Sequence, residues 1–380
     1  MGRVLTPAIT EIYLCDPTGV RIEALDYITS YKYALIANNY SPFSIMLPAK
    51  FDRKKIRLDN IIEIWRGHEP GTLRLDYCGF LRAWLFGDEN GLEYTELHGV
   101  SPLHLLTRRI VANYAGSAQA SMTDQADDMV KAIVKDQLGS DAVGARDLTS
   151  VGGGFTIQAD LADGQSITKG FSWKNVLEIC QEIADASARA GTEVYFDVVP
   201  IVASSVTGAI AFQFRTYTGQ RGSDRTQDSE SPVFVGTEWG NFQNGSLYYD
   251  YTDEKNYVYV MGAGEGNLRE TTELSDTAQI GMSIWNRCEG SKDARHLEFG
   301  DADGRTGDGN TYLYEHKPLF IFDGEIVETP AFRYGRDWFF GDRITATYAG
   351  VTKDAMIKKV VVSKDEGGQE KITAYLEVEE

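Results

Sequence analysis

Cysteine and histidine are scarce in this chain of 380 residues, and their spacing argues against several kinds of site. The four cysteines form no Cys-x-x-Cys pair; they are Cys15, Cys78, Cys180 and Cys288. Such separation favours isolated core cysteines over a disulfide framework or a zinc site. The five histidines form no His-Glu-x-x-His motif; they are His68, His98, His104, His296 and His316. We therefore expect structural or surface roles for them and no metal site.

Long apolar runs are also missing. The opening segment, MGRVLTPAIT, has no apolar stretch long enough for a signal peptide, so synthesis and retention in a cytoplasm-like compartment are expected. The longest uncharged run, Val198 to Phe214, contains Pro200 and Gly208. This composition predicts a hairpin and not a membrane span.

Positive charge is in short supply. Lys and Arg total 37 against 56 Asp and Glu, which gives a net charge of -19 that is spread along the chain. Such a surface repels phosphate backbones and anionic lipids, so tight nucleic-acid or membrane binding is not expected. High solubility is the simplest consequence.

Signatures of catalysis are absent as well. No Gly-x-Ser-x-Gly elbow and no phosphate-binding P-loop occur, and the stretch GAGEGN has Asn267 where a dinucleotide fingerprint needs its last glycine. We expect a glycine turn there. The segment GDADGRTGDGN brings Asp301, Asp303 and Asp308 into one predicted loop, but its fifth, sixth and twelfth positions do not fit a calcium-binding EF-hand. We therefore predict no catalytic residues, no cofactor and no metal ligands.

Short β-type segments dominate the first hundred residues. Each is closed by Pro, Asn or Gly, and Asp88-Glu89-Asn90-Gly91 is a hairpin signal between two long apolar runs. The pattern predicts six or seven antiparallel strands, which would close into a barrel or sandwich to hide their edges.

The middle of the chain has helical periodicity. One helix is predicted to begin near Ser121 or Thr123 and to end at Gly139, and a second to begin at Ser172 and end at Gly191. A strand pair follows, so residues 107–228 are predicted to form a small α/β module.

The last third returns to β character. Two strands are predicted around a turn at Asp253–Lys255, followed by a looser, loop-rich segment at about 270–330. Three further strands end the chain. The predicted domains are therefore 1–106, 107–228 and 229–380.

Two ten-residue stretches resemble each other across this distance. LDNIIEIWRG ends at Gly67 and GDRITATYAG ends at Gly350, and aligning them matches Asp59 with Asp342. In both, an apolar strand, an acidic turn and another strand follow. The simplest interpretation is a mainly β protein in which two similar β-barrel domains flank the α/β module. Three such chains would place six similar units around one axis.

Several segments resemble the baseplate hub or tail hub proteins of long-tailed bacteriophages, especially the siphophage tail-tip type. They are YSPFSIMLPAKFDRKKIRLDNIIEIWR, FRTYTGQRGSDRT, DEKNYVYVMGAGEGNLRE, NRCEGSKDAR and YGRDWFFGDRITATYAG. The likeness spans essentially the whole chain in the right order, although Ser41-Pro42 stands where the family has a glycine.

This resemblance implies a homotrimeric structural protein of the virion, not an enzyme. Its expected partners are the distal tail protein ring, the tape measure protein and tip or fibre proteins, with DNA only in transit. The net charge suggests an acidic channel wall that repels DNA. No wall-degrading domain is expected after the last strand.

Two alternatives stay open at this point. One is a β-sandwich that binds or cleaves cell-wall glycan, since acidic side chains are abundant and paired carboxylates cleave glycosides. The other is the hub of a phage-related contractile injection system, which would share the same fold.

Overall fold

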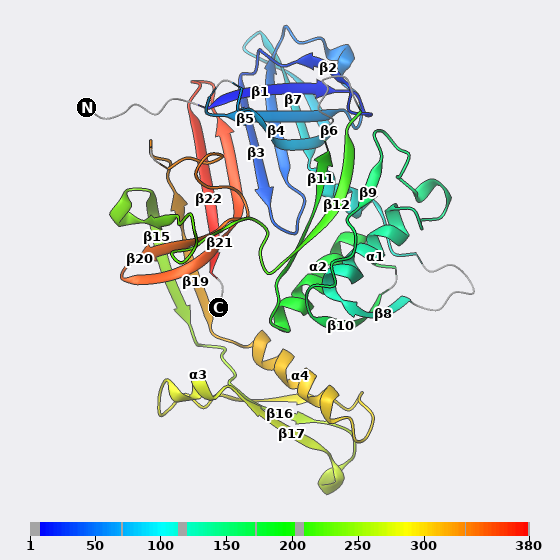
Figure 1. Ribbon diagram of the computed structural model, residues 1–380, viewed down its shortest axis with the longest axis vertical. Coiled ribbons are helices and arrows are strands. Elements are labelled where there is room, and N and C mark those ends of the chain that lie inside the picture. The colour runs from blue at the N-terminus through cyan, green and yellow to red at the C-terminus, as the bar shows by residue number, and fades with distance from the viewer. Residues whose placement is uncertain are drawn as a thin grey trace. The chain divides into compact units, whose positions relative to one another are not determined.

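The computed structural model describes residues 8–69, 71–112, 120–171, 173–201, 209–330 and 332–378. It divides into two compact units. The first contains the chain up to Gly245 together with the part from Asp323 onwards, and the second is Ser246–Phe322. Figure 1 shows the strands and helices of both.

The first unit is built on one twelve-stranded sheet. Its members are β1 (Ile9–Cys15), β2 (Arg21–Ala24), β3 (Ser30–Ile36), β4 (Pro42–Pro48), β5 (Ile61–Gly67), β6 (Arg74–Glu89), β7 (Leu92–Val100), β13 (Asp224–Arg225), β14 (Phe234–Gly236), β20 (Arg343–Tyr348), β21 (Val351–Lys364) and β22 (Glu370–Val378). The order is β13-β20-β21-β3-β4-β7-β6-β5-β1-β2, with β14 on β20 and β22 on β21.

Local sequence explains these strands. In β4, Phe43, Ile45 and Leu47 are buried and alternate with more exposed positions, as expected of a sheet with one covered face. The predicted hairpin between β6 and β7 is confirmed: the two strands pair antiparallel, and Asn90 and Gly91 in the turn have φ values of 55° and 81°, in the left-handed region.

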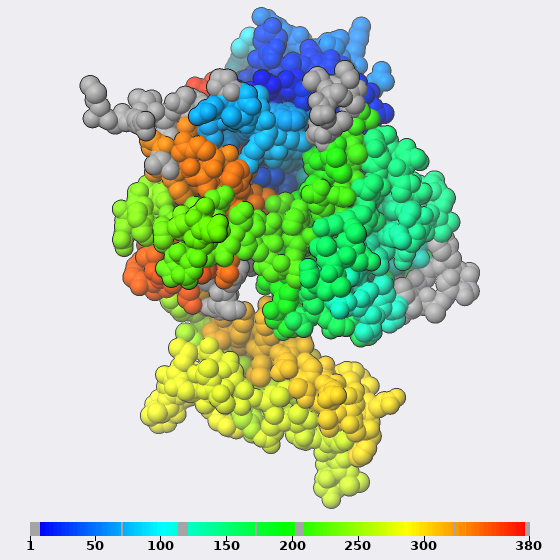
Figure 2. Space-filling view, in the orientation of Figure 1, coloured from blue at the N-terminus to red at the C-terminus, as the bar shows by residue number. Residues whose placement is uncertain are grey.

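The mainly β character and the α/β module are confirmed, but the β-modules are not separate closed barrels. The outer edge of β3 pairs with β21, from Tyr31 opposite Lys364 to Ile36 opposite Lys359. N-terminal and C-terminal strands thus share one sheet. The pairing of β3 with β21 covers two strand edges that barrel closure was expected to cover. Figure 1 shows β21 and β22 beside β3, and Figure 2 shows an orange C-terminal segment against light-blue N-terminal residues.

The α/β module lies in the first unit. Its elements are β8 (Ala120–Gln125), α1 (Ala126–Leu138), β9 (Phe155–Ile157), β10 (Ser166–Phe171), α2 (Val176–Arg189), β11 (Val194–Ile201) and β12 (Ala211–Thr218). Strands β11 and β12 pair antiparallel, as predicted for this hairpin. Both helices bury an apolar face in a core shared with β11 and β12.

The predicted helix ends are right in part. Gly139 follows α1 as predicted, but Ser121 and Thr123 belong to β8, so neither begins the helix. Ser172 lies outside the described residues. Helix α2 is capped by Asn175, whose side chain accepts a hydrogen bond from the Leu177 amide at 2.9 Å.

The second unit contains β16 (Tyr257–Met261), β17 (Thr271–Ser275), α3 (Thr277–Gly281), β18 (Glu289–Asp293) and α4 (Ala302–Glu315). Its core consists of Val258, Val260 and Ala294 with partly buried neighbours. Both strands predicted around the turn at Asp253–Lys255 are present, and the second of them, β16, pairs with β17 and β18. The first is β15 (Phe242–Asp250), and it pairs with β19 (Leu319–Ile326).

The glycine-rich segment predicted as a loop is instead helix α4. Asp301 caps this helix by accepting a hydrogen bond from the Gly304 amide at 2.8 Å. Gly309 lies so close to Leu274 that a Cβ atom there would be 2.1 Å from its Cδ1. Tertiary packing therefore selects a helix against the low helical propensity of glycine.

Short 3₁₀ helices complete the described chain: η1 (Arg53–Lys55), η2 (Pro102–Arg108), η3 (Gly144–Arg146), η4 (Thr237–Trp239) and η5 (Gly266–Leu268). Within the described residues, no helix has the length and apolar composition needed to cross a membrane.

Candidate functional site

The residues considered for metal binding do not converge. Asp301 caps α4, Asp303 lies in the first turn of that helix, and Asp308 is 3.6 Å from His296. Among the described residues, no group of three or more His, Cys, Asp or Glu side chains is arranged to hold a metal ion. The GAGEGN segment forms the predicted turn, in which Gly264 and Gly266 have positive φ.

The other histidines have separate local roles. His98 is 3.1 Å from Glu96 on the same strand, and the Nε2 atom of His68 is 2.7 Å from the carbonyl of Tyr334. The pKa of His104 is lowered by burial and by the nearby Arg108 and Arg82.

The sheet contains a repeated turn. The amide of Asn60 donates to the carbonyl of Arg57 at 3.2 Å, and the Asn60 side chain accepts from the Arg57 amide at 2.5 Å. In the second copy, the amide of Asp342 donates to the carbonyl of Phe339 at 3.2 Å, and the Asp342 side chain accepts from the Phe339 amide at 2.9 Å. Both side chains are buried, so each closes its turn without competition from water.

Each turn also meets the following strand in the same way. The amide of Leu81 donates to the carbonyl of Asn60 at 2.7 Å, and the amide of Ile357 donates to the carbonyl of Asp342 at 2.9 Å. One residue later, the pairing of β6 with β7 shifts between Leu81 and Ala83. The pairing of β21 with β22 shifts between Ile357 and Lys359. A β-bulge thus occurs at the same place in both copies.

These contacts change the alignment of the two repeats by one residue. Asn60, not Asp59, is the counterpart of Asp342. Asp59 and Gly341 then correspond, and both have positive φ, at 60° and 87°. The sequence match of Asp59 with Asp342 was therefore wrong in register, although the duplication of the strand–turn–strand unit is real in the contacts.

The second half of β21 is paired along both of its edges. Its edge from Lys359 to Lys364 pairs with β3, and its residues Val360 and Val362 are fully buried. Since Leu81 corresponds to Ile357, the counterparts of Val360 and Val362 are Trp84 and Phe86 in β6. The residues opposite them on the neighbouring strands support this alignment. Trp84 lies opposite Leu97 in β7 and Val360 lies opposite Ala374 in β22, and both Leu97 and Ala374 are fully buried.

The corresponding half of β6 is open. Trp84 is 39% exposed and Phe86 is 44% exposed. Strand β5 reaches only as far as Phe80 along this edge, and no described strand pairs with the remainder. The sequence did carry a signal, since the run Ala83-Trp84-Leu85-Phe86 is apolar on both faces of a strand. Both faces of this run are exposed, since Leu85, on the face opposite Trp84 and Phe86, is 49% exposed.

A polar network fixes the two copies to each other within the chain. Asp76 accepts hydrogen bonds from Tyr33 and, at 3.0 Å, from Tyr334, and Arg66 donates through Nε to Glu370 at 2.8 Å. Burial and the charge of Asp76 raise the pKa of both tyrosines well above the usual value. Both hydroxyls therefore stay protonated as donors at neutral pH.

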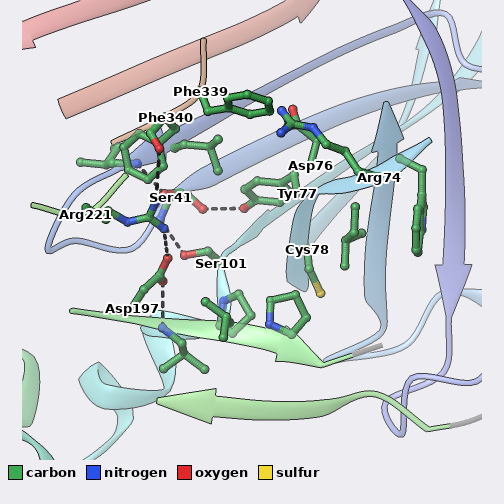
Figure 3. A pocket seen from close by; sticks show the side chains of 18 of the residues that line it. Ser41, Arg74, Asp76, Tyr77, Cys78, Ser101, Asp197, Arg221, Phe339 and Phe340 are labelled. Atoms are coloured by element: carbon green, nitrogen blue, oxygen red, sulfur yellow. Dashed lines mark hydrogen bonds and ion pairs between the residues drawn. The ribbon is translucent and has the colours of Figure 1, made fainter. Parts of the chain in front are cut away.

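A pocket of about 470 Å³ opens beside this network, and Figure 3 shows its lining. Arg74 is 2.9 Å from Asp76, and Arg221 is 2.6 Å from Asp197. The two guanidinium groups lie 4.2 Å from the ring centres of Phe339 and Phe340 respectively. Because each cation has a carboxylate and an aromatic partner, these contacts position the 334–340 segment.

Comparison with solved structures supports the fold. The chain is similar to a tail protein from Neisseria meningitidis MC58 (TM-score 0.54, 10% identity, 98% of this chain and 96% of that one). It is also similar to the 43 kDa tail protein of prophage MuSo2 from Shewanella oneidensis (0.57, 9%, 96% and 97%). A third similar structure is prophage tail protein gp18 from Listeria monocytogenes EGD-e (0.52, 10%, 97% and 95%).

The fold is therefore that of phage and prophage tail proteins, and the resemblance to tail hub proteins seen in the sequence is confirmed. Residues 10–376 match the family model of Siphovirus ReqiPepy6 Gp37-like proteins, so the chain belongs to that family. The comparison with curated proteins finds no match.

Proposed function

We propose that this protein is a non-enzymatic hub of a phage tail tip. Three copies form a ring that joins the sixfold tail tube and distal tail ring to a threefold tip. The ring lines the channel for the tape measure protein and DNA, and it also contacts tip or fibre proteins. Segments 1–106 and 229–380 act as its two tube-like modules, with 107–228 as the α/β module between them.

The observation that carries this proposal is the difference between two equivalent strand edges. In β21 the edge is paired with β3 and its apolar residues are fully buried, whereas in β6 the edge is open and Trp84 and Phe86 are exposed. The two edges are equivalent positions of the two repeats, and one of them is paired within the chain while the other is not. This difference supports pairing of the open β6 edge with a second chain.

The chain order also suggests which strand would pair there. Strands β3 and β4 precede β5–β7, just as β15 and β19 precede β20–β22. Strand β4 pairs with β7, and Glu325 of β19 lies 3.8 Å from Lys371 of β22. Strand β15 is thus the counterpart of β3, and within the described residues it pairs only with β19.

A closed ring follows from joining unlike edges. If β6 of one chain pairs with β15 of the next, each contact between chains repeats the contact of β21 with β3 inside the chain. Head-to-tail contacts of this kind close when the rotation per copy divides a full turn. With two modules in each chain, closure at three copies gives six similar units.

The test is a pair of double variants. Trp84→Lys with Phe86→Lys places charge on the open edge, and Trp173→Lys with Leu161→Lys makes the same kind of change at exposed positions of the α/β module. Covering the exposed part of each edge side chain is worth about 1 kcal/mol, and edge lysines oppose strand pairing.

We expect the wild-type chain and the control variant to assemble as three times 42.2 kDa in light scattering and as three copies in each purified tail. The edge variant should stay monomeric and should be lost from tails while keeping its circular dichroism spectrum. Equal assembly of the edge and control variants would contradict the proposal, as would a copy number other than three.

A further inference from the structure

One face of the twelve-stranded sheet carries a row of paired residues that crosses six strands. From β22 to β6 the row consists of Lys371, Ser363, Lys32, Ser44, His98 and Ala83. Paired residues lie side by side on the same face of a sheet, and adjacent strands are ~4.8 Å apart, so the row is ~24 Å long. The next residues along the strands, such as Tyr33, Phe43 and Leu97, point into the buried core. The row therefore lies on the open face.

This open face is hollowed and positively charged. A cavity of about 610 Å³ spreads over β3, β4, β21 and β22. Its charged lining consists of Lys32, Lys359 and Lys371 against the single carboxylate of Glu325, and His98 at its side is 3.1 Å from Glu96. Lys359 lies 5.1 Å from the ring centre of Tyr375, and Lys371 is 3.8 Å from Glu325.

The local excess of cations contrasts with the whole chain, whose net charge is -19. Among the residues that the structure describes, no carboxylate forms an ion pair with Lys32. Hydroxyl donors fill the positions between the lysines, since Ser44, Ser363 and Thr373 lie in the same cavity wall. Ammonium and hydroxyl groups are the side chains that proteins use to contact phosphate oxygens.

We propose that this lysine face is the wall of the channel and that it contacts the phosphate backbone of double-stranded DNA as the DNA passes. The proposal rests on the proposed function, because only a ring gives the face a channel to line. It replaces the acidic wall expected from the net charge. Three lysines in each chain give contacts that are weak, independent of base sequence and sensitive to salt.

Photo-cross-linking tests this contact. Ser363→Cys in a Cys288→Ser background places a single accessible thiol in the row, where a photoactivatable reagent can be attached. Ser140→Cys, an exposed position beside α1, is the matched control. The probe is a duplex of about 20 base pairs, which is long enough to cover the whole ~24 Å row. Capture is measured at 50 and 200 mM salt. Mass photometry of the same samples counts the copies in each particle.

We expect capture at position 363 and not at position 140. Three phosphate contacts give a slope of about -2.7 in log affinity against log salt, so a fourfold rise in salt should lower affinity about 40-fold. Replacing Lys32, Lys359 and Lys371 by Glu should abolish capture, and replacing them by Gln should remove most of it. The control K54E/K135E/K174E makes the same charge change at exposed lysines of the same unit that do not line this cavity, and it should bind like wild type.

The outcomes separate the two proposals. A trimer that captures no duplex, or equal capture by the face variant and the control variant, overturns the lysine-face proposal and leaves the hub. Capture by a protein that never forms trimers overturns the hub and the channel together. Capture of a polyglutamate probe without capture of the duplex would assign the face to an acidic protein and would overturn the assignment to DNA.

Discussion

Asn60 and Asp342 hold equivalent places in the two halves of one sheet. Each accepts a hydrogen bond from the amide three residues before it, and each precedes a strand whose partner carries a β-bulge. Their second contacts also correspond, since Asn60 donates to the carbonyl of Cys15 and Asp342 accepts from the amide of Ser223. The molecule thus contains one structural unit twice, with an amide in one copy and a carboxylate in the other.

Asp342 is predicted to be a major source of stability. Asp342→Ala removes a buried carboxylate that accepts from the amides of Ser223 and Phe339 and pairs with Arg225, so unfolding should become easier by about 3 kcal/mol. Asp342→Asn keeps an acceptor, as Asn60 does, and should lose about 1 kcal/mol. Urea denaturation measures both, and equal losses would contradict the equivalence of the two turns.

Asp59 is predicted to make the protein sensitive to acid. Burial acts to raise the pKa of this carboxyl group, but hydrogen bonds from Arg108 and Arg82 outweigh it, so the pKa is lowered overall. A lowered pKa gives stability that is complete above the unfolded value of about 3.9 and is lost as pH falls through the folded value.

The Asp59→Asn variant should therefore be less stable than wild type at neutral pH, and the difference should shrink below about pH 4, near the unfolded pKa of aspartate. Thermal unfolding from pH 7 to pH 3 measures this. A difference between the two proteins that stays constant across this range would show that the Asp59 carboxylate has no such role.

The buried triad on α1 is predicted to depend on its cation. Lys131 lies 3.0 Å from both Asp127 and Asp128, and all three side chains are buried. Lys131→Met leaves two buried carboxylates without their cation, with only the amides of Leu161 and Ala162 still donating to Asp128, and should cost about 3–5 kcal/mol at pH 7. Without the ammonium, burial raises the pKa of these carboxyl groups, so the deficit should narrow as pH falls toward 4, their approximate unfolded pKa.

Lys135→Met is the matched control on the same helix, because Lys135 is exposed and pairs with Asp141 at the surface. It should change stability little at any pH. If the two variants unfold at the same denaturant concentration, the triad does not stabilise the helix.

Thiol reactivity is predicted to be confined to one residue. Cys15, Cys78 and Cys180 are buried, and burial raises the pKa of each thiol, whereas Cys288 is partly exposed. A thiol reagent should modify one cysteine in the native protein and four after unfolding. Cys288→Ser should remove the native reaction, and rapid modification of a second cysteine in that variant would contradict the buried positions.

Much of the fold could be predicted from local patterns, because strands, hairpins and amphipathic helices depend on neighbouring residues. The hairpin at Asn90-Gly91 and the glycine end of α1 are examples. The pairing of β3 with β21 could not be predicted, because it joins segments from opposite ends of the chain. Helix α4 was missed because its glycines are selected by close packing on Leu274 and not by propensity.

The open edge of β6 was visible in the sequence only as an apolar run. The exposure of Trp84 and Phe86 becomes informative only by comparison with their buried counterparts, Val360 and Val362. That correspondence depends on the bulges at Arg82 and Lys358. The alignment of the two repeats from sequence was wrong by one residue because Asp59 and Asp342 are both aspartates. Their backbones differ, and Asp59 corresponds to Gly341, which also has positive φ.

The most direct test of the hub is a cryo-EM map of the assembled tail tip at a resolution that separates strands. The account predicts three copies in a ring, with the Ala83–Glu89 edge of each β6 paired to β15 of the neighbouring copy and Trp84 and Phe86 covered. A map in which the β6 edge stays open to solvent, or pairs with its own counterpart in a twofold contact, would contradict it.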